Sequence, residues 1–303
     1  MKINKLSDNN PVRPLLRSLL QKAVRRGYVE LVQKVVFALA ERGDSTWLHT
    51  RAGVIVFEEC WPCASLLTDG TPSAVTLESV TAMRKNKNAA GLGSLAYAAS
   101  EGDLYAIQNS IDPIAVKIVA AALKRPDSFF KWAISQCNDE EQLAVVLASQ
   151  RFISKASWPW DKAFMVAGAY LSCSGKVPQT QLSKILPSAP FPFWVAVDKH
   201  TPQGKKAFRR VALDLGVSER ALGWASFYFE SAMTNDLSSS PWWVSESEWR
   251  FGSLGLSLDE ATKLWVSAAP FIELMVKPQS DNLLGLVGDD GRGSMRDGDF
   301  TLI

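Results

Sequence analysis

The chain has few of the residues from which most catalytic and metal sites are built. Its 303 residues include only two histidines, His49 and His200, and only four cysteines. No window offers the ~20 uncharged residues of a membrane span, and no stretch has the G-x-x-x-x-G-K-[ST] pattern of a phosphate-binding loop. Alternating Val/Ile/Thr segments joined by Asn-Gly or Asp-Gly turns are also missing. The sequence therefore predicts neither an ATPase site nor a β-sheet.

The overall composition is that of an ordinary folded protein. Hydrophobic residues make up 47% and charged residues 21% of the chain, which excludes a disordered or rod-like protein. The length favours about two domains, each able to bury a core. Residues 1–10 are mostly polar and no apolar signal-peptide core follows them. We therefore expect a cytoplasmic protein without a membrane partner.

Apolar residues recur at helical spacing along most of the chain. Between residues 15 and 57 this spacing indicates three short-linked helices. Gly27 and Gly43 are expected to end the first two, and Asp44 or Ser45 to begin the third, which should end near Pro62. Later helix starts combine a capping residue with proline or an acidic residue: Asp112-Pro113, Asn138 with Glu141, Thr201-Pro202, Ser218, and Ser257 with Glu260. The sequence predicts an all-α fold, an array of antiparallel helix hairpins.

Proline and glycine clusters suggest where this array divides. The proline-rich stretch 178–192 predicts a surface connection between an N-terminal helical domain (1–177) and a C-terminal helical domain (178–277). From residue 278 the helical pattern fails and glycine interleaves with aspartate, which predicts a flexible acidic tail over 278–303.

The end of this tail resembles the acidic tails of bacterial-type single-stranded-DNA-binding proteins, which recruit partners through an apolar tip. The residues that carry the resemblance, and that we expect to bind a partner, are Asp299, Phe300, Leu302 and Ile303. The tail could equally be a disordered end without a role.

The segment Cys60-Trp61-Pro62-Cys63 has the C-x-P-C form of thioredoxin-like redox sites. Such sites follow a strand, whereas Cys60 is expected to end a helix beside Glu58 and Glu59. The helix C-terminus and both carboxylates should raise the pKa of the thiol. Structural thiols are the favoured interpretation, and a redox pair or half of a zinc site are the alternatives, since Cys137 and Cys173 are single.

Asp198 and His200 could suggest an acid/base pair, but a helix-entry segment explains them more simply. We expect no catalytic residue, no metal and no cofactor.

Three basic clusters stand out in a chain whose net charge is only +2. In residues 1–51, ten basic residues face four acidic ones, a difference of +6. Such clusters neutralise nucleic-acid phosphates, and nearby tryptophans could stack on unpaired bases. The simpler alternative is a solvated helix face. The candidate nucleic-acid-binding residues are Arg17, Lys22, Arg25 and Arg26, then Arg84, Lys85 and Lys87, and finally Lys205, Lys206, Arg209 and Arg210.

The first third of the chain resembles a known helical region. The residues concerned are the run Leu19–Gly27, Glu30-Leu31, Trp47–Arg51 and Ile55–Glu59. The types and the order of these residues are similar to those in the C-terminal collar of clamp-loader-like AAA+ proteins, in particular the replication-associated recombination ATPases. The resemblance covers about residues 11–60, with Glu58-Glu59 where that family has Glu-Asp, and no ATPase module precedes it. It implies a collar-like helical scaffold in DNA metabolism.

Two hypotheses for function follow. The first is a non-enzymatic accessory protein of replication, recombination or transcription, which binds DNA, single-stranded rather than duplex, and recruits a polymerase or repair partner. The second is a helical protein-interaction scaffold without nucleic-acid contact, which could form an oligomer and whose aromatic anchors would be Trp242-Trp243 and Trp158–Trp160. Core packing is the alternative for these tryptophans. An enzyme, using Asp198, His200, Cys60 or Cys63, is the third and least favoured hypothesis.

Overall fold

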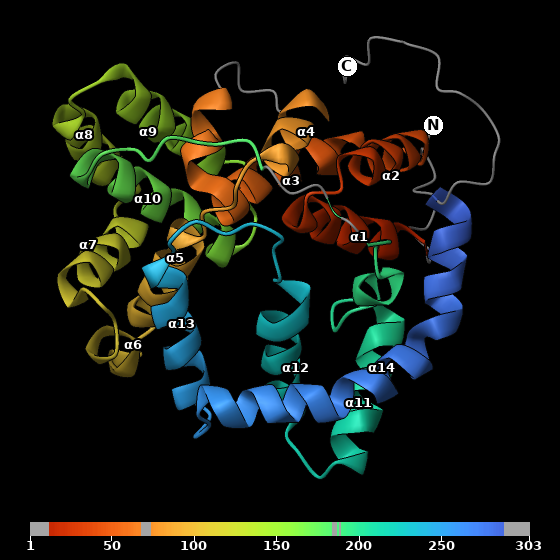
Figure 1. Cartoon of the computed structure of the whole chain (residues 1–303). Coiled ribbons are helices and arrows are strands. Elements are labelled where there is room, and N and C mark those ends of the chain that lie inside the picture. Colours follow the sequence, from red (N-terminus) through yellow and green to blue (C-terminus); the bar gives the residue numbers. More distant parts are fainter. Residues whose placement is uncertain (1–11, 68–73, 184–186, 188, 288–303) are drawn as a thin grey trace, which may run out of the picture.

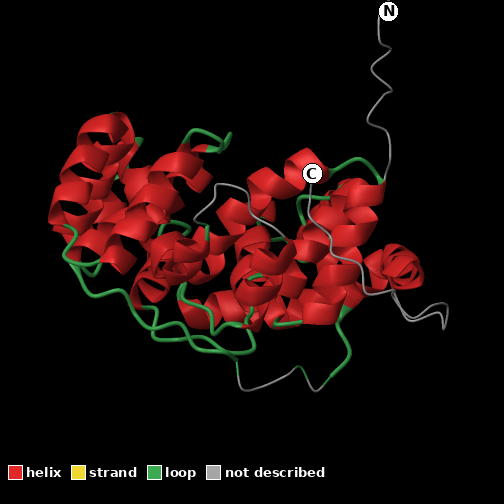
Figure 2. Ribbon diagram, turned by 90° about the horizontal axis from the view of Figure 1, so that it is seen from above, coloured by secondary structure: helices red, strands yellow, loops and turns green. Residues whose placement is uncertain are grey.

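The computed structural model describes residues 12–67, 74–183, 187 and 189–287, and these residues form a helical protein (Figures 1 and 2). They contain fourteen α-helices, short 3-10 and π-helical turns, and isolated β-bridges in place of a sheet, so the all-α prediction is confirmed. The α-helices are α1 (Arg13–Arg26), α2 (Val29–Glu41), α3 (Ser45–Cys60), α4 (Ala74–Ala82), α5 (Asn88–Ser100), α6 (Leu104–Gln108), α7 (Pro113–Lys124), α8 (Pro126–Gln136), α9 (Glu140–Ile153), α10 (Pro159–Ser174), α11 (Pro202–Asp214), α12 (Glu219–Ser226), α13 (Pro241–Gly252) and α14 (Leu258–Val287). The short turns are η1 (Trp61–Leu66), η2 (Phe193–Ala196) and η3 (Phe227–Ser231).

The local signals for the ends of the first helices are confirmed. Gly27 and Gly43 follow α1 and α2 with φ of 78° and 75°, a left-handed conformation that favours glycine. Asp44 precedes α3, but its carboxylate makes no capping bond. It instead accepts two hydrogen bonds from the guanidinium of Arg17, at 2.7 and 2.6 Å.

Most later helix starts also lie where the sequence predicts them. Asp112, Thr201 and Ser218 accept hydrogen bonds from backbone N–H groups in the first turns of α7, α11 and α12. The Ser257–Glu260 capping box is present at the start of α14. The start of α9 is one residue away from the prediction, because its cap is Asp139 and not Asn138.

The centre of the N-terminal half is α5, which packs against α7, α10 and α13. Small residues allow this, because Gly91 and Gly93 bring neighbouring backbones close to the helix. A methyl group at Gly91 would overlap the backbone of Trp242 in α13, and one at Gly93 would overlap the backbone of Ala163 in α10. The α5 sequence thus fixes how closely its neighbours pack.

An extended segment after α4, Met83–Lys87, crosses the middle of the molecule; we call it the hub segment. Its backbone bonds to three regions distant in sequence: the N–H of Arg84 to Gln181 at 2.8 Å, that of Lys85 to Asp236 at 3.0 Å, and that of Asn86 to Glu59 at 2.8 Å. Its cationic residues are the second basic cluster predicted from the sequence. Lys85 and Lys87 of that cluster are buried, as is Asn86 between them.

The stretch 178–192 does connect α10 to the C-terminal helices, but one hydrophobic cluster continues across it. The expected start of the tail at residue 278 is wrong, since α14 continues to Val287 through Pro270 and Pro278. Leu283 and Val287 are buried, which explains why the helix continues. The helix bends along its length and passes α12 and α11 before it reaches α2 (Figure 1). Residues 288–303 lie outside the described residues.

The close packing of α5 can be tested with alanine. Gly91→Ala should lower the free energy of unfolding by about 1–3 kcal/mol, because the new methyl group overlaps the backbone of α13. Gly285→Ala is the matched control in an exposed helical position with open space around it, and it should add up to ~1 kcal/mol. Urea unfolding of both variants measures the difference. An unchanged stability of Gly91→Ala would contradict the packing.

Candidate functional site

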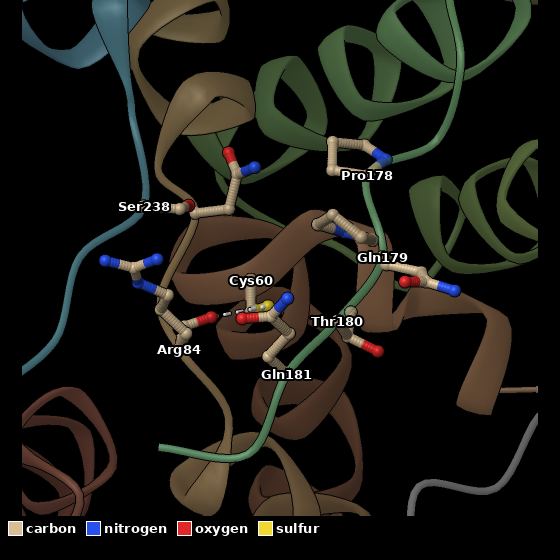
Figure 3. A pocket seen from close by; sticks show the side chains of 9 residues that line it. Cys60, Arg84, Pro178, Gln179, Thr180, Gln181 and Ser238 are labelled. Carbon is tan, nitrogen blue, oxygen red and sulfur yellow. Dashed lines mark hydrogen bonds between the residues drawn. The ribbon is translucent and has the colours of Figure 1, made fainter. Parts of the chain in front are cut away.

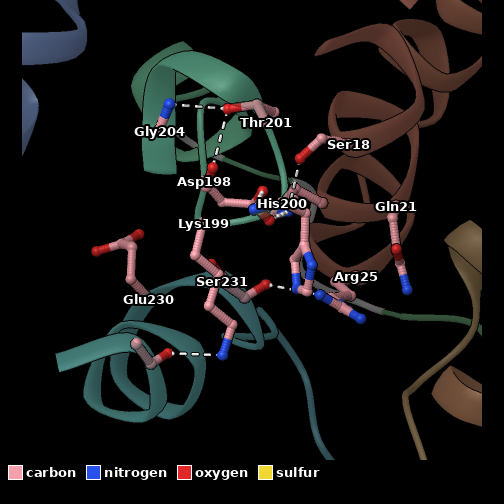
Figure 4. Close-up of polar contacts among 12 residues, drawn as sticks. Ser18, Gln21, Arg25, Asp198, Lys199, His200, Thr201, Gly204, Glu230 and Ser231 are labelled. Atoms are coloured by element: carbon pink, nitrogen blue, oxygen red, sulfur yellow. Dashed lines mark hydrogen bonds and ion pairs between the residues drawn. The ribbon is translucent and has the colours of Figure 1, made fainter. Parts of the chain in front are cut away.

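The predicted basic face of α1 is mostly buried. The guanidinium of Arg25 contacts the carboxylates of Glu58 and Glu59, and the ammonium of Lys22 contacts Asp198. Arg26 pairs with Glu230 and is 6% exposed. Figure 4 shows Arg25 and Gln21 on α1 near the segment that carries Asp198. The prediction that Lys22, Arg25 and Arg26 contact nucleic acid is therefore wrong: their charges are neutralised inside the fold.

Both lysines of the hub segment are buried as well. Lys85 donates hydrogen bonds to the backbone carbonyls of Val80, Thr81 and Met83, at 2.9, 2.8 and 2.6 Å, and so caps the C-terminal end of α4. Lys87 lies 2.8 Å from a carboxylate oxygen of Glu59. Neither side chain can reach a phosphate in solvent, so these two nucleic-acid predictions are also wrong.

These contacts belong to one buried charge network centred on the end of α3. Glu59 is 0% exposed and its two oxygens pair separately with Arg25 and Lys87. Its neighbour Glu58 pairs with Arg25 and also with Arg51, at 3.2 Å. Arg51 in turn reaches Asp161 of α10 at 3.0 Å. The network joins α1, α3, α10 and the hub segment. We call it the Glu59 network.

Burial and ion pairing act against each other within this network. Burial would raise the pKa of Glu58, but Arg25 and Arg51 outweigh it and hold that pKa below its usual value. Burial lowers the pKa of Lys87, and Glu59 opposes that shift. The adjacent Glu58-Glu59 pair in an apolar helix was a sequence signal for buried partners. The sequence does not say which cations those partners are.

The pKa of the Cys60 thiol, which lies beside this network, differs from the prediction. The pKa of Cys60 is lowered, chiefly by a hydrogen bond from Cys63. The expectation that Glu58 and Glu59 raise it is wrong, because Arg25, Arg51 and Lys87 neutralise both carboxylates.

Two of the remaining candidates are partly exposed and already paired. Arg17 is 34% exposed, binds Asp44 at 2.6 Å and lies 4.9 Å from the centre of the Trp47 ring. Arg84 is 46% exposed and binds Asp236 at 2.7 Å. The Arg84–Asp236 pair is exposed and contributes little to stability, so Arg84 could exchange its carboxylate for a phosphate. Asp44 is buried and held by two hydrogen bonds, so Arg17 stays bound to it.

All four residues of the third predicted cluster are exposed. Lys205, Lys206, Arg209 and Arg210 all lie on the solvent side of α11, while Ala207, Phe208 and Val211 face the core. The side chains of Arg209 and Arg210 are 77% and 63% exposed. Exposed Arg220 follows at the start of α12 and was not among the predicted residues. We call these five residues the α11 basic face.

Few carboxylates oppose this face. Arg209 lies 3.6 Å from Glu219, which is 50% exposed, and Arg210 binds Asp214 at 2.8 Å, which is 51% exposed. Five exposed cations and two solvated carboxylates leave an excess of three positive charges along α11 and the start of α12. Of the three predicted basic clusters, this is the one whose members all remain exposed to a polyanion.

The tryptophans mostly fill the interior, so the alternative of core packing applies to them. Trp242 is 8% exposed, and the ring of Trp243 packs against the ammonium of Lys87, 4.6 Å from the ring centre. Arg250 lies between Trp224 and Trp249, 4.0 and 4.1 Å from their ring centres. Trp158, which is 66% exposed, is an exception. The chain's own cations therefore occupy several of the aromatic faces that could stack on a base.

The geometry around Asp198 and His200 does not support the hypothesis of an enzyme. The carboxylate of Asp198 contacts Lys22 and accepts the backbone N–H of His200 at 2.9 Å, so it organises the entry to α11 (Figure 4). Within residues 12–67, 74–183, 187 and 189–287, no group of three or more His, Cys, Asp or Glu side chains is placed to hold a metal ion. No helix among these residues is long and apolar enough to span a bilayer. The predicted partner-binding residues Asp299, Phe300, Leu302 and Ile303 lie outside them.

Comparisons with known family models, curated proteins and solved structures find no match for this chain. The resemblance of residues 11–60 to a clamp-loader collar stays a prediction.

The Glu59 network should dominate stability. Glu59→Gln keeps the shape of the side chain but leaves Lys87 buried without a carboxylate and Arg25 with Glu58 alone, so the free energy of unfolding should fall by about 3–5 kcal/mol. Asp214→Asn removes an exposed partner of Arg210 and should cost less than ~1 kcal/mol. Urea unfolding at neutral pH compares the two. Equal losses in both variants would contradict a buried network.

Lys199 should make stability depend on pH. Its ammonium donates to the carbonyl of Gly223 at 2.9 Å, and burial lowers its pKa to about 8. The unfolded chain then binds more protons than the folded one from about pH 8 to about 10.5, so stability rises with pH in this window. Between about pH 7.5 and 10, the free energy of unfolding of the wild type should rise by about 2 kcal/mol more than that of Lys199→Met. Urea unfolding measures this difference. Lys199→Arg, whose side chain stays charged, should also lack this rise. A rise that persists in both variants would contradict the assignment to Lys199.

Proposed function

We propose that this chain is a non-enzymatic, cytoplasmic accessory protein of DNA metabolism that binds DNA through the α11 basic face. The observation that carries the proposal is the exposure of Lys205, Lys206, Arg209 and Arg210 on one side of one helix. Most cations of the other two basic clusters are buried and have partners inside the fold. The α11 basic face is therefore the main part of the predicted nucleic-acid-binding surface that remains exposed. Recruitment of a polymerase or repair partner through the tail remains part of the same proposal.

The size of this face favours single-stranded DNA over duplex. Residues 205–210 span only ~8 Å of helix axis at 1.5 Å per residue. A flexible single strand can follow such a short convex surface with several phosphates, whereas a rigid duplex presents only a few phosphates to it. Neutralising about four phosphates of a single strand predicts a roughly 50-fold loss of affinity between about 50 and 200 mM salt.

Fluorescence anisotropy with labelled single-stranded and duplex oligomers of equal length tests the proposal at both salt concentrations. Reversal of Lys205, Lys206, Arg209 and Arg210 to glutamate should abolish most of the binding and flatten its salt dependence. The matched control reverses four other exposed cations, Lys117, Lys124, Arg125 and Lys131 on α7 and α8, and should bind nearly as well as the wild type. Equal binding by both variants, or equal loss in both, would refute the α11 basic face as the site.

The outer face of α14 favours a second candidate, the interaction scaffold. Val266, Phe271 and Leu274 are large and apolar, yet they are 67%, 56% and 71% exposed. The occupant with matching charge is a second copy of this chain: in an antiparallel arrangement centred near residue 268, Glu273 lies opposite Lys263, and Lys277 lies opposite Asp259. A mass that rises with concentration in the wild type and not in Leu274→Lys would support this candidate. A monomeric wild type would refute it.

A further inference from the structure

Cys60, the last residue of α3, and Cys63 of η1 are free cysteines whose sulfur atoms are in contact. The thiol of Cys63 donates a hydrogen bond to the sulfur of Cys60 at 3.2 Å, and the thiol of Cys60 donates to the backbone carbonyl of Arg84 at 3.3 Å. Each residue is 1% exposed. The two sulfur atoms are already in contact, so only a small rotation of their side chains separates them from a covalent bond.

A small pocket leads to one of the two sulfur atoms. Its volume is about 130 Å³, and its lining includes Cys60 and Asn86. Figure 3 shows Arg84 and Ser238 on one side of it, and Gln179 and Gln181 on the segment that passes the other side. Cys63 does not line it. One water occupies ~30 Å³ of liquid, so the pocket admits a molecule as small as hydrogen peroxide.

The electrostatics of the pair are asymmetric. The hydrogen bond from Cys63 lowers the pKa of Cys60, and the buried ammonium of Lys85 adds to this effect against burial. The same bond raises the pKa of Cys63. An inert thiol in an apolar environment has a raised pKa, as Cys173 has, with a pKa of about 12 caused mainly by burial. Cys60 therefore has the environment of a nucleophile, and Cys63 that of a thiol that keeps its proton.

We propose that Cys60 and Cys63 are a peroxide-reactive dithiol that closes to an intramolecular disulfide. The Cys60 thiolate attacks one oxygen of hydrogen peroxide; an S–O bond forms, the O–O bond breaks, and hydroxide leaves and takes up a proton as water. The sulfur of Cys63 then attacks the sulfenic acid on Cys60. An S–S bond forms, the S–O bond breaks, and the proton of Cys63 leaves with the hydroxyl as a second water. Two thiols are oxidised by two electrons and one peroxide is reduced to two waters.

Oxidation would change the hub segment, because the Cys60 thiol is the donor to the carbonyl of Arg84. Once the disulfide forms, both sulfur atoms have lost their protons and this carbonyl has lost its donor. The neighbouring Lys87 completes the Glu59 network, and Arg84 stands at the rim of the pocket. The redox state of the pair is thus coupled to a segment that holds several parts of the fold together.

The test uses the full chain treated with a small excess of hydrogen peroxide, followed by alkylation of remaining thiols after unfolding and peptide mass analysis. The peptide with Cys60 and Cys63 should lose two hydrogens and take no label, and dithiothreitol should reverse both changes. This peptide should react faster than Cys137, whose pKa is raised by burial, because Cys60 has the larger thiolate fraction. A pair that stays fully alkylated, or reacts no faster than Cys137, would overturn the proposal.

Two variants distinguish the roles of the thiols. In Cys63→Ser, the reaction should stop at the Cys60 sulfenic acid, which dimedone traps. In Cys60→Ser, Cys63 should remain a thiol at the same peroxide dose. Dimedone labelling of Cys63 instead would overturn the assignment of Cys60 as the nucleophile. The wild-type measurement stands without either variant, so a folding defect in a variant leaves the proposal testable.

Discussion

The fold depends on neutralising one carboxylate that no water reaches. Glu59 lies near the C-terminal end of α3, completely buried, and its two oxygens are held by cations from two different parts of the chain, Arg25 of α1 and Lys87 of the hub segment. An isolated charge in such a position would cost several kcal/mol, so neither cation can leave without the other elements moving. The arrangement of α1, α3 and the hub segment is therefore fixed by charge as well as by apolar packing.

This requirement decides which basic residues remain for function. A chain with nearly equal numbers of acidic and basic residues can present a positive surface only where its cations lack internal partners. In the first third, Lys22, Arg25 and Arg26 each pair with a carboxylate inside the fold. On α11 the cations point to solvent instead, since the opposite side of the helix supplies the apolar contacts. Positive charge there is free to act on a partner.

The sequence predicts the local features of this structure well and the long-range ones poorly. Gly27, Gly43, Asp112 and the Ser257–Glu260 box signal helix ends correctly because each acts on backbone groups within a few residues. The partners of the buried cations are far away in sequence: Lys22 and Asp198 are 176 positions apart. No periodicity reveals such a pair, so a buried basic cluster and a solvated one look the same in the sequence.

The position of Cys60 next to Glu59 gives the thiol chemistry its setting. The carboxylates that would suppress a thiolate are cancelled by Arg25, Arg51 and Lys87, and a further cation, Lys85, lies close enough to favour it. The same cations that make the end of α3 stable therefore remove the repulsion that a thiolate would meet there. In this protein the solution to burying Glu58 and Glu59 also creates the environment in which Cys60 can react, and the hub segment links the two.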